Sequence, residues 1–233
     1  MNKSIRSKLT NVYKRFLNEY GRQYWWPADT SFEVMIGAVM TQNTSWKNVV
    51  KAISRLKSCG KLSPVNVDKM TLDELSEIIR PCGYHRNKAQ TIKNLVYFLK
   101  LYNYNLNQMK QLSISSLRKE LLNIKGIGPE TADSILLYAF EIPIFVVDSY
   151  TRRIFSRIGI LAGTEKYSQI QKLFHSLPKS THLYKEYHAL IVKHAKERCK
   201  KKPVCSTCCI NDLCRKLGVE IPFEADEAEK SQL

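Results

Sequence analysis

The sequence predicts an all-α protein, because almost every periodic segment has helical spacing and the one short β-branched run contains a proline. Residues 31–40 are apolar nearly all round, which is typical of a helix buried at the centre of a domain. Residues 71–74, Thr-Leu-Asp-Glu, have the form of a capping box and open a helix that a proline and a glycine end. The β-branched run, residues 142–147, includes Pro143 and is therefore predicted to be a buried extended connector.

The remaining elements follow from the same periodicity. Residues 89–101 form an amphipathic stretch, and apolar residues recur at helical spacing over 114–124. A further helix is expected over 129–140, since its initial proline suits the first helical position. Another includes His188 and His194, which we interpret as partly buried helix residues rather than ligands.

Charge is the clearest compositional indication of function. The chain of 233 residues has a net charge of +16, from 37 basic and 21 acidic residues. This balance favours nucleic acid as a partner, with an anionic membrane surface second and a basic protein without such a partner third. No apolar run approaches the roughly 18 residues that span a bilayer, and the first residues lack the apolar core of a secretory signal. We therefore expect a soluble, monomeric protein in the cytoplasm, associated with the nucleoid and not with a membrane.

Five of the seven cysteines fall within residues 199–214. In a reducing compartment such a cluster is more typical of a metal site than of disulfides. The candidate ligands are Cys199, Cys205, Cys208 and Cys214. These four cysteines contain one closely spaced pair, whereas the ligands of structural zinc normally form two closely spaced pairs. Cys209 is expected to be spare, because adjacent cysteines seldom both bind one metal group.

The segment Lys125-Gly126-Ile127-Gly128-Pro129 lies between two predicted helices. Two glycines two positions apart let the backbone turn tightly and approach a partner closely, which a Cβ would hinder. Amide groups of the turn and of the following helix start would then point outward as an anion site. A helix–helix turn without any function is an equally good interpretation of these five residues alone.

The wider context of this hairpin resembles a known family. Residues 124–133, followed by Pro143 and Val147-Asp148, resemble the helix-hairpin-helix, Gly/Pro…Asp motif of the endonuclease III superfamily of DNA glycosylases. Residues 40–44, Met-Thr-Gln-Asn-Thr, resemble the segment that ends the first barrel helix of that family. Together with the cysteines, the matches run from about residue 23 to residue 214 in the order of the family.

The resemblance implies a two-lobed helix-hairpin-helix glycosylase fold with a [4Fe–4S] cluster loop. Residues 23–134 would form a six-helix barrel domain, residues 1–22 with 135–218 a helical iron–sulfur domain, and residues 219–233 an acidic tail. The four candidate cysteines would bind the cluster, although the first gap has five residues where the family usually has six. The cluster would order a basic loop that includes Lys201 and Lys202 against phosphates.

Asp148 is the expected catalytic residue. It matches the aspartate of the family, and a carboxylate beside C1′ would stabilise the positive charge that develops as an N-glycosidic bond breaks. From its position alone, Asp148 would instead be the cap of a helix starting near Ser149, and the two roles are compatible. Glu130 departs from the family pattern, because members that also cut the DNA backbone have a lysine there that forms a Schiff base. A glutamate cannot do so; Glu130 is interpreted as a helix N-terminal carboxylate.

All three tryptophans lie near the start of the chain, flanking the buried helix. Clustered indoles suit an everted cationic base, because stacking is then reinforced by a cation–π interaction. Trp25, Trp26 and Trp46, with Gln42 and Asn43, resemble the 3-methyladenine glycosylase branch and are the expected substrate-binding residues. Core anchoring is the alternative for the tryptophans. By resemblance Gln42 would fill the space left by the flipped base, and its alternative is a polar residue that closes a buried helix.

These observations predict a monofunctional DNA glycosylase of base excision repair that removes alkylated, 3-methyladenine-type purines from double-stranded DNA. In this hypothesis Lys125, Gly126 and Gly128 hold a DNA phosphate. The alternatives are a glycosylase and lyase for oxidised pyrimidines, a mismatch glycosylase, and an iron–sulfur DNA-binding module without enzymatic activity.

Overall fold

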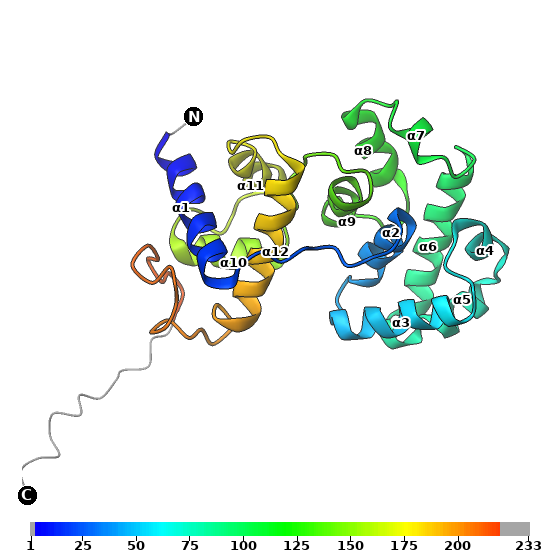
Figure 1. The fold of residues 1–233 in the computed structure, drawn as a ribbon, viewed down its shortest axis with the longest axis horizontal. Coiled ribbons are helices and arrows are strands. Elements are labelled where there is room, and N and C mark those ends of the chain that lie inside the picture. The colour runs from blue at the N-terminus through cyan, green and yellow to red at the C-terminus, as the bar shows by residue number, and fades with distance from the viewer. Residues whose placement is uncertain (1–2, 220–233) are drawn as a thin grey trace, which may run out of the picture.

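Two groups of helices lie end to end in the computed structural model, which describes residues 3–219 (Figure 1). Every regular element among these residues is helical, so the predicted all-α class is confirmed. In chain order the elements are α1 (Lys3–Tyr20), α2 (Ser31–Met40), α3 (Trp46–Ser58), α4 (Pro64–Lys69), α5 (Leu72–Ile78), η1 (Arg80–Cys82), α6 (His85–Lys100), α7 (Leu106–Met109), α8 (Ile114–Asn123), α9 (Pro129–Ser134), η2 (Ile135–Ala139), α10 (Ser149–Ile158), α11 (Tyr167–Phe174) and α12 (Thr181–Glu197).

Helix α2 is the centre of the larger group, as its apolar sequence predicts. It contacts α3, α6, α9 and η2, and every residue after Ser31 is buried. Thr30 caps the helix by accepting a hydrogen bond from the Glu33 backbone N–H at 3.1 Å. The one buried charge on α2, the Glu33 carboxylate, lies 3.0 Å from Lys57 Nζ on α3. Helix α2 is thereby fixed with its C-terminal end at the cavity described below.

The smaller group consists of α1, α10, α11 and α12 (Figure 1). Helix α12 packs against α1 and α10, and the Tyr187 hydroxyl donates a hydrogen bond to Leu9 O on α1 at 2.8 Å. The predicted connector, residues 142–147, has no regular structure and is largely buried where Phe145 stacks on Phe174. Asp148 follows this connector directly and caps α10, so the burial of the connector fixes the start of that helix.

Most predicted helices are present with small changes at their ends. The capping box is formed, since Thr71 Oγ1 accepts from Glu74 N and Glu74 Oε2 accepts from Thr71 N. Helix α6 begins four residues before the predicted stretch, at His85, and the helix from Pro129 continues as the π-helical segment η2 up to Ala139. Helix η2 contacts both α2 and α12 and thus joins the two groups. The domain limits at residues 23, 134 and 218 stay predictions, and the acidic tail lies outside the described residues apart from Val219.

Candidate active site

A cavity of about 810 Å³ lies where the two groups of helices meet. Its wall is formed by the segment before α2, the turn between α2 and α3, the start of α9, the start of α10, and one face of α12. The volume is within the range of small-molecule sites. All the residues predicted to bind substrate or catalyse line this one cavity: Trp25, Trp26, Gln42, Asn43, Trp46 and Asp148.

The Asp148 side chain caps α10 and also lines the cavity. One oxygen, Oδ1, caps α10 by accepting hydrogen bonds from Thr151 N and Thr151 Oγ1, each at 2.7 Å. The other oxygen, Oδ2, lies 3.6 Å from His188 Nε2 at the cavity wall. Burial alone would raise the pKa of Asp148, but His188 and the hydrogen bonds from Thr151 outweigh it and hold that pKa below its usual value. The side chain is therefore a rigid carboxylate that is ionised at neutral pH.

His188 lines the cavity as well, which sequence reasoning did not predict. It is buried on α12, and its Nδ1 lies 2.7 Å from the Tyr138 hydroxyl of η2. If Tyr138 donates in that hydrogen bond, the imidazole proton lies on Nε2 and faces Asp148. Among residues 3–219, Nε2 has no hydrogen-bond partner. His188 thus lies next to Asp148 in the cavity wall, and no local pattern could have indicated this proximity across forty positions.

Aromatic rings surround the same cavity. The Trp25 and Trp26 rings are stacked with centroids 5.8 Å apart, and Trp46 meets Trp26 edge-on at 5.3 Å. Tyr138 contacts Trp26 edge-on at 5.3 Å. Gly37 of α2 provides the seat for Trp26, since a Cβ there would lie 3.2 Å from the indole. The indoles therefore pack on the core with one part of their surface and line the cavity with another, which combines the two interpretations made from the sequence.

Glu130 also lines this cavity, at the second position of α9. Glu130 is exposed to solvent, although its carboxyl has enough protein around it to be partly desolvated. Burial and the nearby Asp148 carboxylate raise the pKa of Glu130 to about 7, against smaller opposing effects of His188 and Arg152. Interpreting Glu130 only as a dipole-stabilised carboxylate therefore missed its place beside Asp148.

The hairpin glycines have different roles. Gly126 has φ +98°, and a Cβ there would collide with Thr91 on α6, so this glycine is required by packing inside the protein. Gly128 caps α9 and has open space beside it, which leaves its backbone accessible. Gln42 Nε2 donates to Gly126 O at 3.1 Å and to Thr131 Oγ1 at 2.9 Å. The turn after α2 is thus tied directly to the hairpin.

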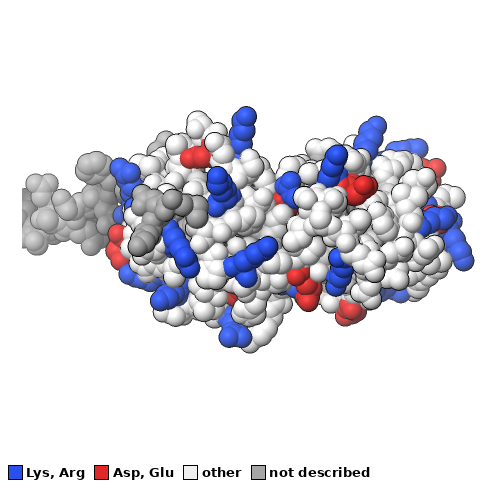
Figure 2. Space-filling model, turned by 90° about the horizontal axis from the view of Figure 1, so that it is seen from above, with Lys and Arg blue, Asp and Glu red and all other residues white. Residues whose placement is uncertain are grey.

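Basic side chains are plentiful on the surface. Figure 2 shows Lys and Arg spread along the length of one face, with fewer acidic side chains among them. The predicted phosphate contacts Lys125, Lys201 and Lys202 are all exposed. This distribution suits an extended polyanion better than a small anion at one patch.

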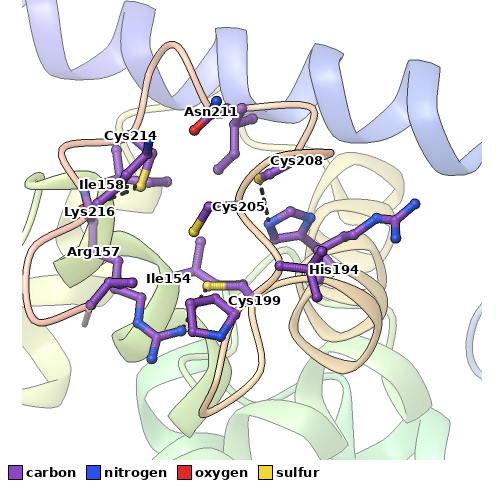
Figure 3. A pocket seen from close by; sticks show the side chains of 15 residues that line it. Ile154, Arg157, Ile158, His194, Cys199, Cys205, Cys208, Asn211, Cys214 and Lys216 are labelled. Carbon is purple, nitrogen blue, oxygen red and sulfur yellow. Dashed lines mark hydrogen bonds between the residues drawn. The ribbon is translucent and has the colours of Figure 1, made fainter. Parts of the chain in front are cut away.

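The four candidate cysteines line a second pocket, between the C-terminal loop, α10 and α12. Figure 3 shows Cys199, Cys205, Cys208 and Cys214 around it. Cys209, the cysteine expected to be spare, is not among the lining residues. No three His, Cys, Asp or Glu side chains within residues 3–219 come close enough to hold one metal ion, so the thiols surround the pocket without forming a mononuclear site.

Polar groups are directed at these sulfur atoms. Arg157 Nη1 lies 3.3 Å from Cys199 Sγ, and the Lys216 backbone N–H donates to Cys214 Sγ at 3.4 Å. Arg157 also donates to the Lys200 and Lys201 carbonyls, at 2.6 and 3.0 Å. The basic loop is therefore anchored to α10 from the same side as the thiols.

The described residues combine an all-helical fold, a glycine hairpin and a buried carboxylate at one cavity. The chain belongs to the HhH-GPD superfamily of base excision DNA repair proteins, whose profile matches residues 36–179. It is 48% identical over 210 residues to a candidate DNA repair glycosylase of Methanocaldococcus jannaschii, covering 88% of this chain and 95% of that protein.

Two further similar proteins are named for different activities. An endonuclease III of Sulfolobus acidocaldarius is 31% identical over 186 residues, which cover 79% of this chain and 81% of that protein. The crystal structure of the H. pylori 3-methyladenine DNA glycosylase bound to 1,N6-ethenoadenine matches with a TM-score of 0.72 and 27% identity, over 83% of this chain and 97% of that one. The resemblance read from the motifs is therefore confirmed at the level of the superfamily. Among residues 3–219, no helix is long and apolar enough to cross a bilayer.

Proposed function

We propose that this chain is a monofunctional DNA glycosylase that hydrolyses the N-glycosidic bond of alkylated, 3-methyladenine-type purines. The observation that carries the proposal is the single cavity shared by the Asp148 carboxylate and the three indoles, with a glutamate where lyase members have their lysine. The likeness to the H. pylori 3-methyladenine glycosylase supports the same substrate class.

The chemistry follows from the charges of the cavity. A purine alkylated at N3 or N7 is cationic in DNA, so it stacks favourably on indole rings and leaves as a neutral base. As the C1′–N9 bond breaks, its electron pair moves to the purine and positive charge develops on the sugar beside Asp148. The carboxylate stabilises that charge and orients a water molecule, whose oxygen bonds to C1′ and whose proton passes to solvent through the carboxylate. The products are a free base and an abasic site.

DNA binding is proposed to use the hairpin and the basic loop. Backbone amides at Gly126 and Gly128, with Lys125, would hold one phosphate, while Lys201 and Lys202 contact the backbone nearby. Gln42 would occupy the space of the flipped base, which requires it to exchange its present hydrogen bonds for contacts with DNA.

Base release from defined duplexes tests the function. We expect the purified protein to release 3-methyladenine and 7-methylguanine from alkylated DNA and to leave abasic sites uncut. Borohydride should trap little covalent complex, because Glu130 occupies the position of the lysine whose amine forms the Schiff base in lyase members. Efficient trapping on oxidised pyrimidines would instead support the endonuclease III-like alternative, for which the Sulfolobus relative is the specific argument. Release of mismatched bases alone would favour the mismatch alternative.

We further propose that the four lining cysteines hold a [4Fe–4S] cluster. Four thiols spread around one pocket suit a cluster, in which each iron takes one thiolate, better than a single zinc ion. Hydrogen bonds to two of the sulfur atoms are typical of such sites. When bound, the cluster would supply a structural link that orders the loop carrying Lys201 and Lys202; the reaction at Asp148 does not pass through it.

Adjacent cysteines provide a matched test of this cofactor. We expect protein purified without oxygen to contain about four iron atoms per chain and a visible charge-transfer band. Cys208→Ser should lower the iron content and the absorbance, because Cys208 lines the pocket, whereas Cys209→Ser should retain both. Equal iron loss in the two variants would refute the ligand assignment, and zinc in place of iron would refute the cluster.

A further inference from the structure

Glu130 is the one acidic side chain at the cavity that the proposed mechanism leaves unused. Its carboxyl forms no hydrogen bond or ion pair with any residue between 3 and 219; only its backbone carbonyl is engaged, by Ser134 Oγ at 2.8 Å. Asp148 and His188 line the same cavity, and both act electrostatically on the Glu130 carboxyl. A titratable group without a structural partner, facing a reaction cavity, is available to exchange a proton with whatever occupies that cavity.

We propose that Glu130 is a general acid that donates a proton to the departing base, so that the enzyme accepts neutral modified purines as well as cationic ones. This inference rests on the proposed glycosylase function and extends its substrate class. A cationic purine leaves as a neutral molecule without help, whereas a neutral purine would leave as an anion unless a ring nitrogen is protonated. Asp148 stabilises the charge on the sugar for both classes of substrate, and Glu130 protonates the departing base only when the purine is neutral.

The electrostatics of the cavity separate the two carboxyl groups. Hydrogen bonds from Thr151 and the nearby His188 keep the pKa of Asp148 low against the effect of burial. Glu130 has no such donors, and burial and repulsion from Asp148 raise its pKa to about 7. Two neighbouring carboxyl groups whose pKa values are driven apart are the usual sign of an acid paired with a charge-stabilising base.

The surroundings of Glu130 are consistent with that titration. From α10, Asp148 raises its pKa and Arg152 lowers it, while His188 of α12 lowers it. Tyr150 and Lys196 line the same cavity, and the wall formed by residues 41–46 has no titratable side chain. A substantial fraction of Glu130 is therefore protonated at neutral pH, and this fraction falls as the pH rises through about 7.

The proposed step balances without a co-reactant. The C1′–N9 bond breaks and its electron pair enters the purine, which takes the Glu130 proton on a ring nitrogen. Water adds to C1′, and one water proton returns through solvent to the Glu130 carboxylate. The net reaction is the hydrolysis of one N-glycosidic bond, with a neutral base and an abasic site as products.

The test compares two substrates in single-turnover reactions with the full-length protein. Duplexes contain either cationic 7-methylguanine or a neutral purine, 1,N6-ethenoadenine or hypoxanthine. For Glu130→Gln, excision of the neutral purines should fall by about 10²-fold or more, the usual worth of a general acid. Excision of 7-methylguanine should stay within about threefold and report on correct folding in the same preparation. Glu77→Gln, at an exposed carboxylate of α5, is the control.

The pH profile provides the second readout. Wild-type excision of neutral purines should decline as the pH rises through about 7, and that decline should be absent in Glu130→Gln. An equal loss on both substrates, or no loss on either, overturns the general-acid role. Excision of 7-methylguanine alone by the wild type also overturns it, yet leaves the proposed function standing. If the wild type excises neither class, the proposed function itself fails.

Discussion

Replacing Asp148 by asparagine is expected to slow base release by at least about 10²–10³-fold while leaving the fold intact. The reason is that Oδ1 caps α10, whereas the charge of the carboxylate is what the proposed reaction requires. An asparagine oxygen can still accept the hydrogen bonds from Thr151 that start α10. The negative charge that would stabilise the oxocarbenium-like sugar is lost, however, because an amide is neutral. Single-turnover base release from alkylated duplexes measures the effect.

A second substitution separates the cap from the charge. Asp148→Ala removes both, and it should cost about 1 kcal/mol of stability beyond Asp148→Asn, as the loss of an N-cap usually does. Thermal denaturation of the two variants should therefore differ, whereas both should be nearly inactive. Retention of wild-type base release by Asp148→Asn would show that the residue is only a cap and that the reaction does not depend on this carboxylate. Absence of base release from the wild type as well would favour a DNA-binding module without enzymatic activity.

Local signals in the sequence were sufficient to predict the helices that begin with a capping residue. The Thr71 capping box and the Asp148 cap each involve residues within three positions of one another. Both could therefore be predicted, and both are present. Helix α2 was predictable at both ends, because its apolar character extends over its whole length. Family resemblance then identified the wall residues of the cavity before any contact between them was known.

Contacts between distant helices were not predictable in this way. The pairing of Tyr138 with His188, and of His188 with Asp148, depends on how η2, α10 and α12 pack, and no spacing in the sequence encodes it. From the sequence, Glu130 was interpreted as a departure from the lysine pattern of the family. Its raised pKa, however, results from burial and from a carboxylate eighteen positions away, so its proposed role as an acid could only be inferred from the assembled cavity.

The hairpin contains an ion pair between a half-buried arginine and a fully buried aspartate, and the loss of this pair should have the largest effect on stability. Arg118 of α8 donates to both oxygens of Asp133 on α9, from Nε at 2.7 Å and from Nη2 at 3.0 Å. Asp133 is completely buried and also accepts from Gln171 of α11 at 2.7 Å. One carboxylate thus joins the two helices of the hairpin to the helix group on the other side of the cavity.

Arg118→Met is expected to lower the free energy of unfolding by about 3–5 kcal/mol, because it leaves the Asp133 charge buried with only neutral partners. The matched control is Lys100→Met, which breaks the exposed pair with Asp68 and should cost no more than about 1 kcal/mol. Denaturant unfolding of both variants measures the difference, with an unchanged m-value indicating that the same surface is exposed. Similar losses in the two variants would contradict a dominant role for the buried pair. A large loss confined to Arg118→Met would instead show that this ion pair holds α8 against α9, the two helices that flank the proposed phosphate-binding turn.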